Sequence, residues 1–308
     1  PQIMPPVRES IDVCGTLTSE VAKAVGLPAG IPVAGGGADN ACGAVGTGIV
    51  KSGRALSSIG TSGVVLVQTD VPRTDPEAKV HTFNHAIPNR WYNMGVSLSA
   101  GLSLKWFRDT LGHLEKQMEA LSGIDAYDLL TKQAAPVPPG SEGLLFLPYL
   151  TGERTPHADA NARGVFVGIS PRHTKGHLIR AVLEGVVFAL RDSLEIIRGM
   201  GTDVPEIRAI GGGAKSSLWR QIQADVLNVP IATLNIDEGP AFGAALLAGV
   251  AAGVYPSVTE AAESSISIVG VTEPNPAAAK VYEEYYQAYR ALYPALKGEF
   301  ARISQLTR

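Results

Sequence analysis

Three glycine-rich segments carry the residues best suited to chemistry on phosphate groups. They read AGGGADNACG over 34–43, SIGTSG over 58–63 and IGGGAKSS over 210–217. Each follows an apolar run typical of a β-strand, so each glycine cluster is expected in a turn at a strand end. Glycine lets the backbone approach a ligand closely, and backbone N–H groups in such turns bind phosphate oxygens. The segments therefore indicate a site for a phosphorylated ligand, although 58–63 is also compatible with a plain hairpin turn.

Asp39 is the candidate for catalysis in the first of these segments. It follows three glycines and opens a predicted small-residue helix over 39–50. A carboxylate at that position can cap the helix. It can also accept a proton from a substrate hydroxyl, as phosphoryl transfer requires. The spacing alone favours the cap and leaves both roles open.

Several known phosphate and nucleophile motifs do not fit the sequence. The third segment is not a P-loop, because Ala214 precedes Lys215 where that motif has glycine. It also lacks the last glycine of the dinucleotide-binding fingerprint. GTSG over 60–63 misses the nucleophile elbow of hydrolases by one residue, which weakens a hydrolase interpretation.

The elements that must position these residues follow an α/β order. A hairpin of β-branched residues is predicted over 55–69, and strands are predicted near 80–87, 90–96, 143–150, 164–169 and 206–213. Helices are predicted over 19–27, 39–50, 174–200, 239–253 and 275–295, with a further helix from about Ser99. The Ala/Gly composition of 239–253 favours close packing, and the tyrosines of 275–295 indicate a packing face. Alternating strands and helices predict α/β architecture.

Composition excludes several classes of protein. The 308 residues carry a net charge of −3, which argues against nucleic acid and anionic membranes as partners. Two cysteines, Cys14 and Cys42, do not support a disulfide framework, and the six histidines lack zinc-ligand spacing. No apolar stretch reaches membrane-spanning length and no signal-peptide pattern is present, so a cytoplasmic protein is expected.

The segment GVFVGISPRHTKGHLIRAVLE over 164–184 resembles the second signature of the FGGY carbohydrate kinases along its length. The resemblance extends over essentially the whole chain, because other segments follow in family order: GGGADNACGAVGTGIV, SIGTSG, LPYLTGERTPHADANARG, GGGAKSSLWRQIQADVLNVPI and GPAFGAALLAG. It implies an actin/Hsp70/hexokinase-like (ribonuclease H-like) ATPase fold, α/β with a mixed sheet flanked by helices. Such kinases have two domains with a cleft between them.

The resemblance also implies roles for individual residues. Asp39 matches the catalytic base that deprotonates the attacking hydroxyl, which reverses the preference for a cap, and Asn40 lies where relatives contact the sugar. ATP with Mg²⁺ is the implied cosubstrate, and no protein residue is assigned to the metal. The residues that match nucleotide contacts are Gly60, Thr61, Gly101, Lys105, Gly212, Gly213 and Ser217.

GERTPH (152–157), AVLEGV (181–186) and SSLWRQIQAD (216–225) resemble the branch of the family that acts on D-xylulose more than they resemble glycerol kinases. The implied reaction is ATP-dependent phosphorylation of a pentulose, D-xylulose to D-xylulose 5-phosphate. Ribulose, gluconate and glycerol stay open as substrates, and a homodimer is possible. The loop with Glu153, Arg154 and His157 is expected to be solvated and without a catalytic role.

The domain organisation implied by the resemblance is incomplete. Residues 1–53 are expected to be the tail of the N-terminal sugar-binding domain, and 54–308 the C-terminal nucleotide-binding domain. The first phosphate loop of the family and most of the sugar pocket have no counterpart in the sequence, so the N-terminal half is expected to lie outside this chain. The second hypothesis is a stand-alone nucleotide-binding module without kinase activity. ATP-dependent phosphorylation of a ketose distinguishes the two.

Overall fold

The computed structural model describes residues 3–237 and 239–306 and centres on a seven-stranded mixed sheet, in the order β11-β10-β9-β3-β4-β6-β5. β9 pairs in parallel with β3 and β10, and the other neighbours pair antiparallel. The strands are β3 (Arg54–Ile59), β4 (Gly63–Thr69), β5 (His81–Asn84), β6 (Trp91–Ser97), β9 (Glu206–Gly211), β10 (Ile231–Leu234) and β11 (Ile268–Thr272). The predicted hairpin over 55–69 is confirmed as β3–β4.

The register of the sheet brings two of the glycine-rich segments together. β3 and β9 run in parallel with Ile59 beside Gly211, so both strands end at the same edge. The turn 60–62 then connects Ile59 to its antiparallel partner Gly63. Parallel strands with their carboxyl ends at one edge create the crevice in which α/β proteins bind ligands.

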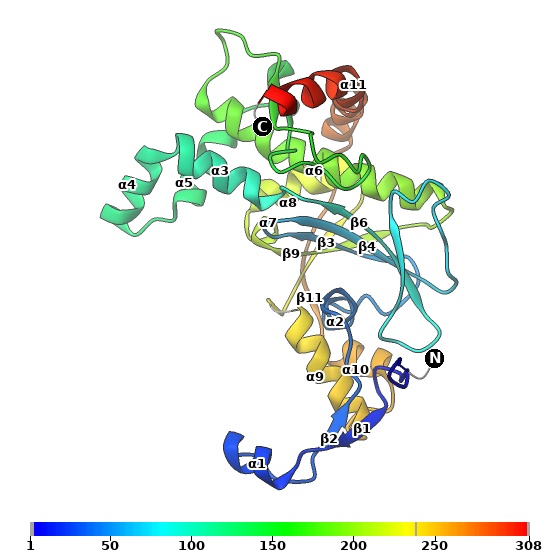
Figure 1. Ribbon diagram of the computed structural model, residues 1–308. Helices are drawn as coiled ribbons and strands as arrows, with labels where there is room; N and C mark the ends of the chain where they lie inside the picture. Colours follow the sequence, from blue (N-terminus) through cyan, green and yellow to red (C-terminus); the bar gives the residue numbers. More distant parts are fainter. Residues whose placement is uncertain (1–2, 238, 307–308) are drawn as a thin grey trace.

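Helices cover both faces of the sheet (Figure 1). One face carries α3 (Gly101–Leu111), α6 (Lys175–Gly199), α8 (Ser217–Leu227) and α11 (Pro276–Leu306); the other carries α2 (Asp39–Gly46), α9 (Gly239–Ala251) and α10 (Val258–Ser265). Strand side chains alternate between the two apolar cores, since Ala55 and Val65 join the α6 side while Leu56 and Leu66 join the α2 side. The predicted α/β architecture, with a mixed sheet flanked by helices, is confirmed.

The tyrosines of α11 form a packing face, as predicted. Tyr282, Tyr286, Tyr289 and Tyr293 are buried against the α6 side of the sheet. Their hydroxyls need partners in that interior. Tyr286 donates to the buried carboxylate of Asp192 at 2.7 Å, and Tyr282 donates to Glu184 at 2.7 Å.

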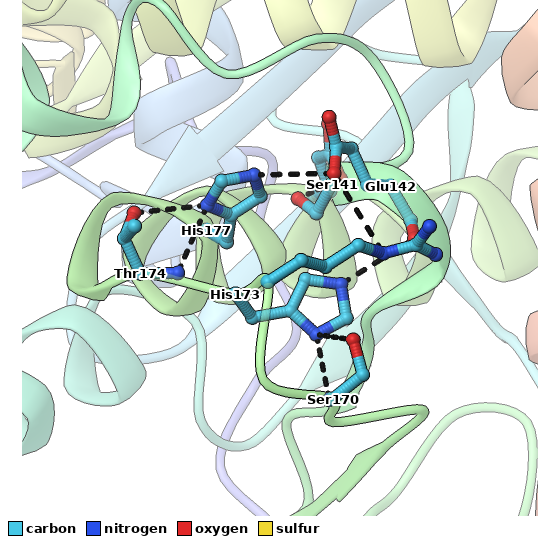
Figure 2. A network of polar contacts seen from close by, with 8 residues as sticks. Ser141, Glu142, Ser170, His173, Thr174 and His177 are labelled. Atoms are coloured by element: carbon cyan, nitrogen blue, oxygen red, sulfur yellow. Dashed lines mark hydrogen bonds and ion pairs between the residues drawn. The ribbon is translucent and has the colours of Figure 1, made fainter.

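Polar contacts fasten the start of α6 to the turn at 141–143, which forms the short 3-10 helix η1 (Ser141–Gly143) (Figure 2). The Thr174 backbone N–H donates to His177 Nδ1 at 3.1 Å, and the Ser170 N–H donates to His173 Nδ1 at 2.9 Å. Arg172 Nη2 donates to the Glu142 carbonyl at 2.7 Å. These residues belong to the signature segment 164–184, so part of that segment serves to anchor the long helix.

The remaining elements are smaller. They are β1 (Val13–Thr16), α1 (Ser19–Val25), β2 (Pro32–Ala34), α4 (His113–Ser122), α5 (Ala126–Ala134), β7 (Leu145–Leu147), β8 (Val165–Val167) and α7 (Gly212–Lys215). The predicted helix over 19–27 is confirmed and ends before Gly26, which adopts a φ of 72°. Of the described helices, none is both long and apolar enough to cross a membrane.

Helices α2 and α9 cross with their backbones in contact. A Cβ at Gly46 would overlap the carbonyl oxygen of Gly239 and lie 2.6 Å from the nitrogen of Gly243. A Cβ at Gly243 would overlap the carbonyl oxygen of Cys42. Only glycine allows helices to approach this closely. The close packing predicted for the Ala/Gly helix is therefore confirmed, and its partner is the helix that carries Asp39.

We expect Gly46→Ala to lower the free energy of unfolding by about 1–3 kcal/mol, because the new methyl must push the two backbones apart. Gly298→Ala is the matched control. Gly298 also lies inside a helix, but no atom lies within 4 Å of the site of a new Cβ. The control is expected to keep or gain stability, by up to about 1 kcal/mol. Thermal unfolding followed by circular dichroism measures both; equal melting temperatures would contradict the close crossing.

Candidate functional site

A pocket of about 520 Å³ opens at the sheet edge where β3 and β9 end. Its walls come from the strand ends, α3, α5, α7 and α8. It is lined by Ile59, Gly60, Thr61, Gly101, Leu102, Leu104, Lys105, Asp125, Tyr127, Asp128, Thr131, Gly212, Gly213, Lys215, Ser216 and Trp219. Every residue predicted to contact nucleotide lines this pocket except Ser217. The glycine-rich segments 58–63 and 210–217 thus meet at this pocket, whereas 34–43 does not line it.

The turn after β3 is held by backbone hydrogen bonds to the start of α3. The Gly101 N–H donates to the Gly60 carbonyl at 2.8 Å, and the Leu102 N–H donates to the Thr61 carbonyl at 3.1 Å. A Cβ at Gly101 would overlap the Gly60 carbonyl oxygen, so this approach requires glycine. Gly60 itself is exposed, and the nearest atom to a Cβ there would be the Ser62 carbonyl oxygen at 3.8 Å. The backbone of Gly60 is therefore exposed to the pocket and is not covered by a side chain.

Gly211, the last residue of β9, and Gly213 just after it pack against Ile59, the last residue of β3. Gly211 adopts a φ of 77°, and a Cβ there would lie 2.6 Å from the Ile59 carbonyl oxygen. A Cβ at Gly213 would lie 2.6 Å from the Ile59 Cβ. A side chain at Gly213 would therefore collide with Ile59. Gly212, in contrast, is exposed, and the nearest atom to a Cβ there would be the Ile59 carbonyl oxygen at 3.8 Å, an ordinary contact distance.

Two differences from the predicted lining come from the helices. Ser217 is the exposed first residue of α8 and does not line the pocket; its neighbour Ser216 does, and Ser216 Oγ caps the helix by accepting from the Trp219 N–H. Sequence reasoning also missed the wall formed by α5 and its N-cap, whose pocket residues are Asp125, Tyr127, Asp128 and Thr131. Asp125, an acidic N-cap just before a helical run, is the signal that could have identified this wall.

Asp39 and Asn40 lie outside the pocket lining, at the start of α2 on the opposite face of the sheet from α3 and α8. The N-cap of α2 is Ala38, without a side-chain capping bond, so the structure does not support the capping role for Asp39. Asp39 Oδ1 accepts from the Asn40 N–H at 2.7 Å and from Asn40 Nδ2 at 3.1 Å. The carboxylate is exposed and free to meet a ligand.

The Asp39 carboxylate affects the pKa values of two neighbouring groups, Tyr92 and Cys42. Burial, with a smaller contribution from the Asp39 carboxylate, raises the pKa of Tyr92. Burial, with a smaller contribution from the Asp39 carboxylate, also raises the pKa of the Cys42 thiol. Among residues 3–237 and 239–306 the Asp39 carboxylate forms no ion pair, and its hydrogen bonds are those with Asn40.

Glu153 lies in an unexpected environment. The loop around it was expected to be solvated, but the Glu153 side chain is buried with 2% of its surface exposed. Its carboxylate accepts from Ser97 Oγ at 2.8 Å, from the Leu98 N–H at 3.0 Å and from the Arg154 N–H at 2.7 Å. The expectation failed because the polar sequence of the loop concealed this set of internal partners.

A metal ion would need ligands that arrive with a substrate. No cluster of three histidine, cysteine or acidic side chains occurs among residues 3–237 and 239–306. Mg²⁺ is commonly held by substrate phosphates, waters and one or two carboxylates, without a cage made of protein ligands. The donor set is therefore compatible with a magnesium ion that enters with a nucleotide.

Comparison with protein families places the chain clearly. The model of the FGGY family of carbohydrate kinases, C-terminal domain, matches residues 55–252, and the model of the N-terminal domain matches residues 1–46. The chain is 44% identical over 305 residues to a xylulose kinase from Staphylococcus epidermidis, which covers 99% of this chain and 60% of that protein. It is 34% identical over 294 residues to a gluconokinase from Bacillus licheniformis, with coverage of 94% and 56%.

Solved structures agree with the sequence relatives. The ligand-bound xylulose kinase from Lactobacillus acidophilus superposes with a TM-score of 0.88 at 29% identity, over 97% of this chain and 59% of that one. The actin/Hsp70/hexokinase-like fold is thus confirmed. The chain spans about three fifths of the length of the relatives that it matches. Family models and relatives together show that the chain belongs to the FGGY family of carbohydrate kinases.

Proposed function

We propose that this chain provides the nucleotide site and the catalytic base of an ATP-dependent kinase that phosphorylates a pentulose, D-xylulose to D-xylulose 5-phosphate. The observation that carries the proposal is the pocket at the ends of β3 and β9. It brings together Gly60, Gly101 and Gly212 from three separate parts of the chain. Identity of 44% to a xylulose kinase supports D-xylulose as the substrate. A gluconokinase at 34% identity supports gluconate as the second candidate.

Nucleotide would bind in this pocket mainly through backbone. Gly60 and Gly212 present exposed main chain, and Thr61 adds a hydroxyl at the turn. Lys105 and Lys215 supply positive charge for phosphate oxygens, and Trp219 and Tyr127 supply aromatic surface. Mg²⁺ bound to the phosphates would neutralise charge that develops during transfer.

Asp39 would accept the proton of the attacking sugar hydroxyl. Both of its hydrogen bonds to Asn40 use Oδ1, so Oδ2 stays available at the exposed start of α2. A base in this role needs only to hold one proton at hydrogen-bond distance from the hydroxyl. Asn40, half-buried beside it, would orient a sugar hydroxyl through its amide.

We assign residues 1–53 to the sugar-binding domain and 54–308 to the nucleotide-binding domain. The ranges matched by the two family models, 1–46 and 55–252, support this division. In this arrangement Asp39 belongs to one domain and the pocket to the other. Phosphoryl transfer would then take place where the two meet, which is how kinases exclude water during the reaction.

The primary test is ADP release by the 308-residue chain with Mg-ATP and D-xylulose, D-ribulose, gluconate or glycerol, with ATP binding measured by calorimetry in parallel. We expect ATP binding, and the highest kcat/KM with D-xylulose wherever turnover occurs. ATP binding without turnover would mean that this chain is the nucleotide half of a kinase whose catalytic cleft needs the N-terminal domain. Turnover would exclude a module without kinase activity. Absence of ATP binding would overturn the assignment of the pocket.

In a full-length parent that includes the N-terminal domain, Asp39→Asn is expected to lower kcat by about 10²–10⁴-fold, because the amide cannot accept the hydroxyl proton. ATP affinity should stay within about twofold of the parent, since Asp39 does not line the pocket. Steady-state kinetics and calorimetry measure the two effects. Asp12→Asn, on the same N-terminal segment, is the control. Near-normal turnover of Asp39→Asn would remove Asp39 as the base.

Gly60→Ala separates ligand contact from folding. The protein has room for the methyl, but a nucleotide lying on the backbone does not, so ATP affinity should fall by about tenfold at an unchanged melting temperature. Gly213→Val is the comparison, because its side chain would collide with Ile59 and should lower affinity and melting temperature together. Unchanged ATP affinity in Gly60→Ala would show that the nucleotide does not approach this turn.

A further inference from the structure

We propose that Glu153 is a positioning residue for the nucleotide pocket: its carboxylate fixes the backbone at 97–98, and this segment sets the start of α3 against the turn after β3. The inference rests on the proposed nucleotide site. Glu153 does not line the pocket, so its effect would pass through the residues that it holds.

First, hydrogen bonds from the loop 153–155 hold the end of β6 in place. Oε2 of Glu153 accepts from Ser97 Oγ at 2.8 Å, and Oε1 accepts from the Leu98 N–H at 3.0 Å. The loop that carries Glu153 adds a second attachment through Thr155, whose N–H donates to the Val96 carbonyl at 3.0 Å and whose Oγ1 accepts from the Val96 N–H at 3.1 Å. Residues 96–98 therefore have their path set by the 153–155 loop.

The second step leads from Leu98 to the pocket over three residues. Ser99 Oγ and Thr151 Oγ1 lie 2.9 Å apart, which extends the same attachment. The N–H groups of Ala100 and Leu102 both donate to the Thr61 carbonyl, and the Gly101 N–H donates to the Gly60 carbonyl. A displacement at 97–98 would therefore move Gly101 and Leu102, which line the pocket and hold the turn 60–62.

Glu153 does more than fill space in the core, because a buried carboxylate is costly to keep. Burying a carboxylate without a cation is costly, and in the described part of the chain Glu153 forms no ion pair. Burial raises its pKa to about 7, against the three hydrogen-bond donors that favour the charged form. An acid kept at this cost supplies what an apolar residue cannot: two acceptor oxygens directed at Ser97, Leu98 and the Arg154 N–H.

The experiment compares Glu153→Ala and Glu153→Gln in the 308-residue chain, with ADP affinity measured by calorimetry and backbone exchange by hydrogen–deuterium exchange. Glu153→Ala should weaken ADP binding by about tenfold or more, because the N–H of Leu98 loses its buried partner. It should also speed exchange over 97–102 without ligand. Glu153→Gln keeps an acceptor oxygen for the two N–H groups and should stay within about threefold of the parent.

Asp192→Ala is the matched control for loss of a buried carboxyl group. Asp192 is 6% exposed and accepts from Tyr286 of α11. In the described part of the chain it does not bond to the segment 97–102, and it acts on Glu153 only through its charge. It should lower the melting temperature while leaving ADP affinity unchanged. ADP binding by Glu153→Ala equal to that of the parent would overturn the proposal. So would a loss of affinity in Glu153→Gln as large as in Glu153→Ala, since geometry would then not be what Glu153 supplies.

Two further results separate a failure of the proposed role of Glu153 from a failure of the proposed nucleotide site. If Glu153→Ala does not fold, Ser97→Ala removes one of the three contacts, and exchange over 97–102 unchanged from the parent overturns the proposal. If the parent chain does not bind ADP, the proposed nucleotide site fails. The exchange comparison then still decides whether Glu153 holds the start of α3, because it needs no ligand.

Discussion

The contact of three glycines with the end of β3 is the constraint on which the pocket depends. Gly101, Gly211 and Gly213 come from two separate parts of the chain, and each leaves no room for a Cβ beside Ile59 or Gly60. Backbone packed this closely fixes the turn without side chains in the ligand space. The end of β3 is also held by its pairing with β9 and by hydrogen bonds from the start of α3. Glu153 in turn holds the residues just before α3.

The proposed nucleotide pocket and the proposed base lie on different faces of the sheet. The pocket faces the α6 side of the sheet, whereas Asp39 starts a helix on the other face, with its charge exposed. The proposed base therefore lies outside the pocket in the unliganded protein, whereas Asp125 and Asp128 place other carboxylates in the pocket wall. The reacting groups would then be brought into contact only with both substrates present, which limits hydrolysis of ATP by water.

Sequence patterns predicted the central architecture well where periodicity was strong. The hairpin over 55–69, the long helix α6 and the Ala/Gly helix α9 were all anticipated, because their apolar spacing agrees with their burial. Patterns did not indicate α5 as a pocket wall, since its role depends on tertiary position. They misjudged Glu153, because a polar loop sequence does not reveal buried internal donors.

The crossing of α2 and α9 has a consequence for how the protein can be divided. Ala41, Ala44 and Val45 of α2 are buried in the same core as Leu246 and Leu247 of α9. A truncation that removed the segment before residue 54 would expose this apolar surface to water and to other chains. The boundary suggested by domain families is thus a poor place to cut. A fragment meant for crystallisation or for fusion to another protein should retain α2, even though that helix carries Asp39, which we propose as the base and assign to the other domain.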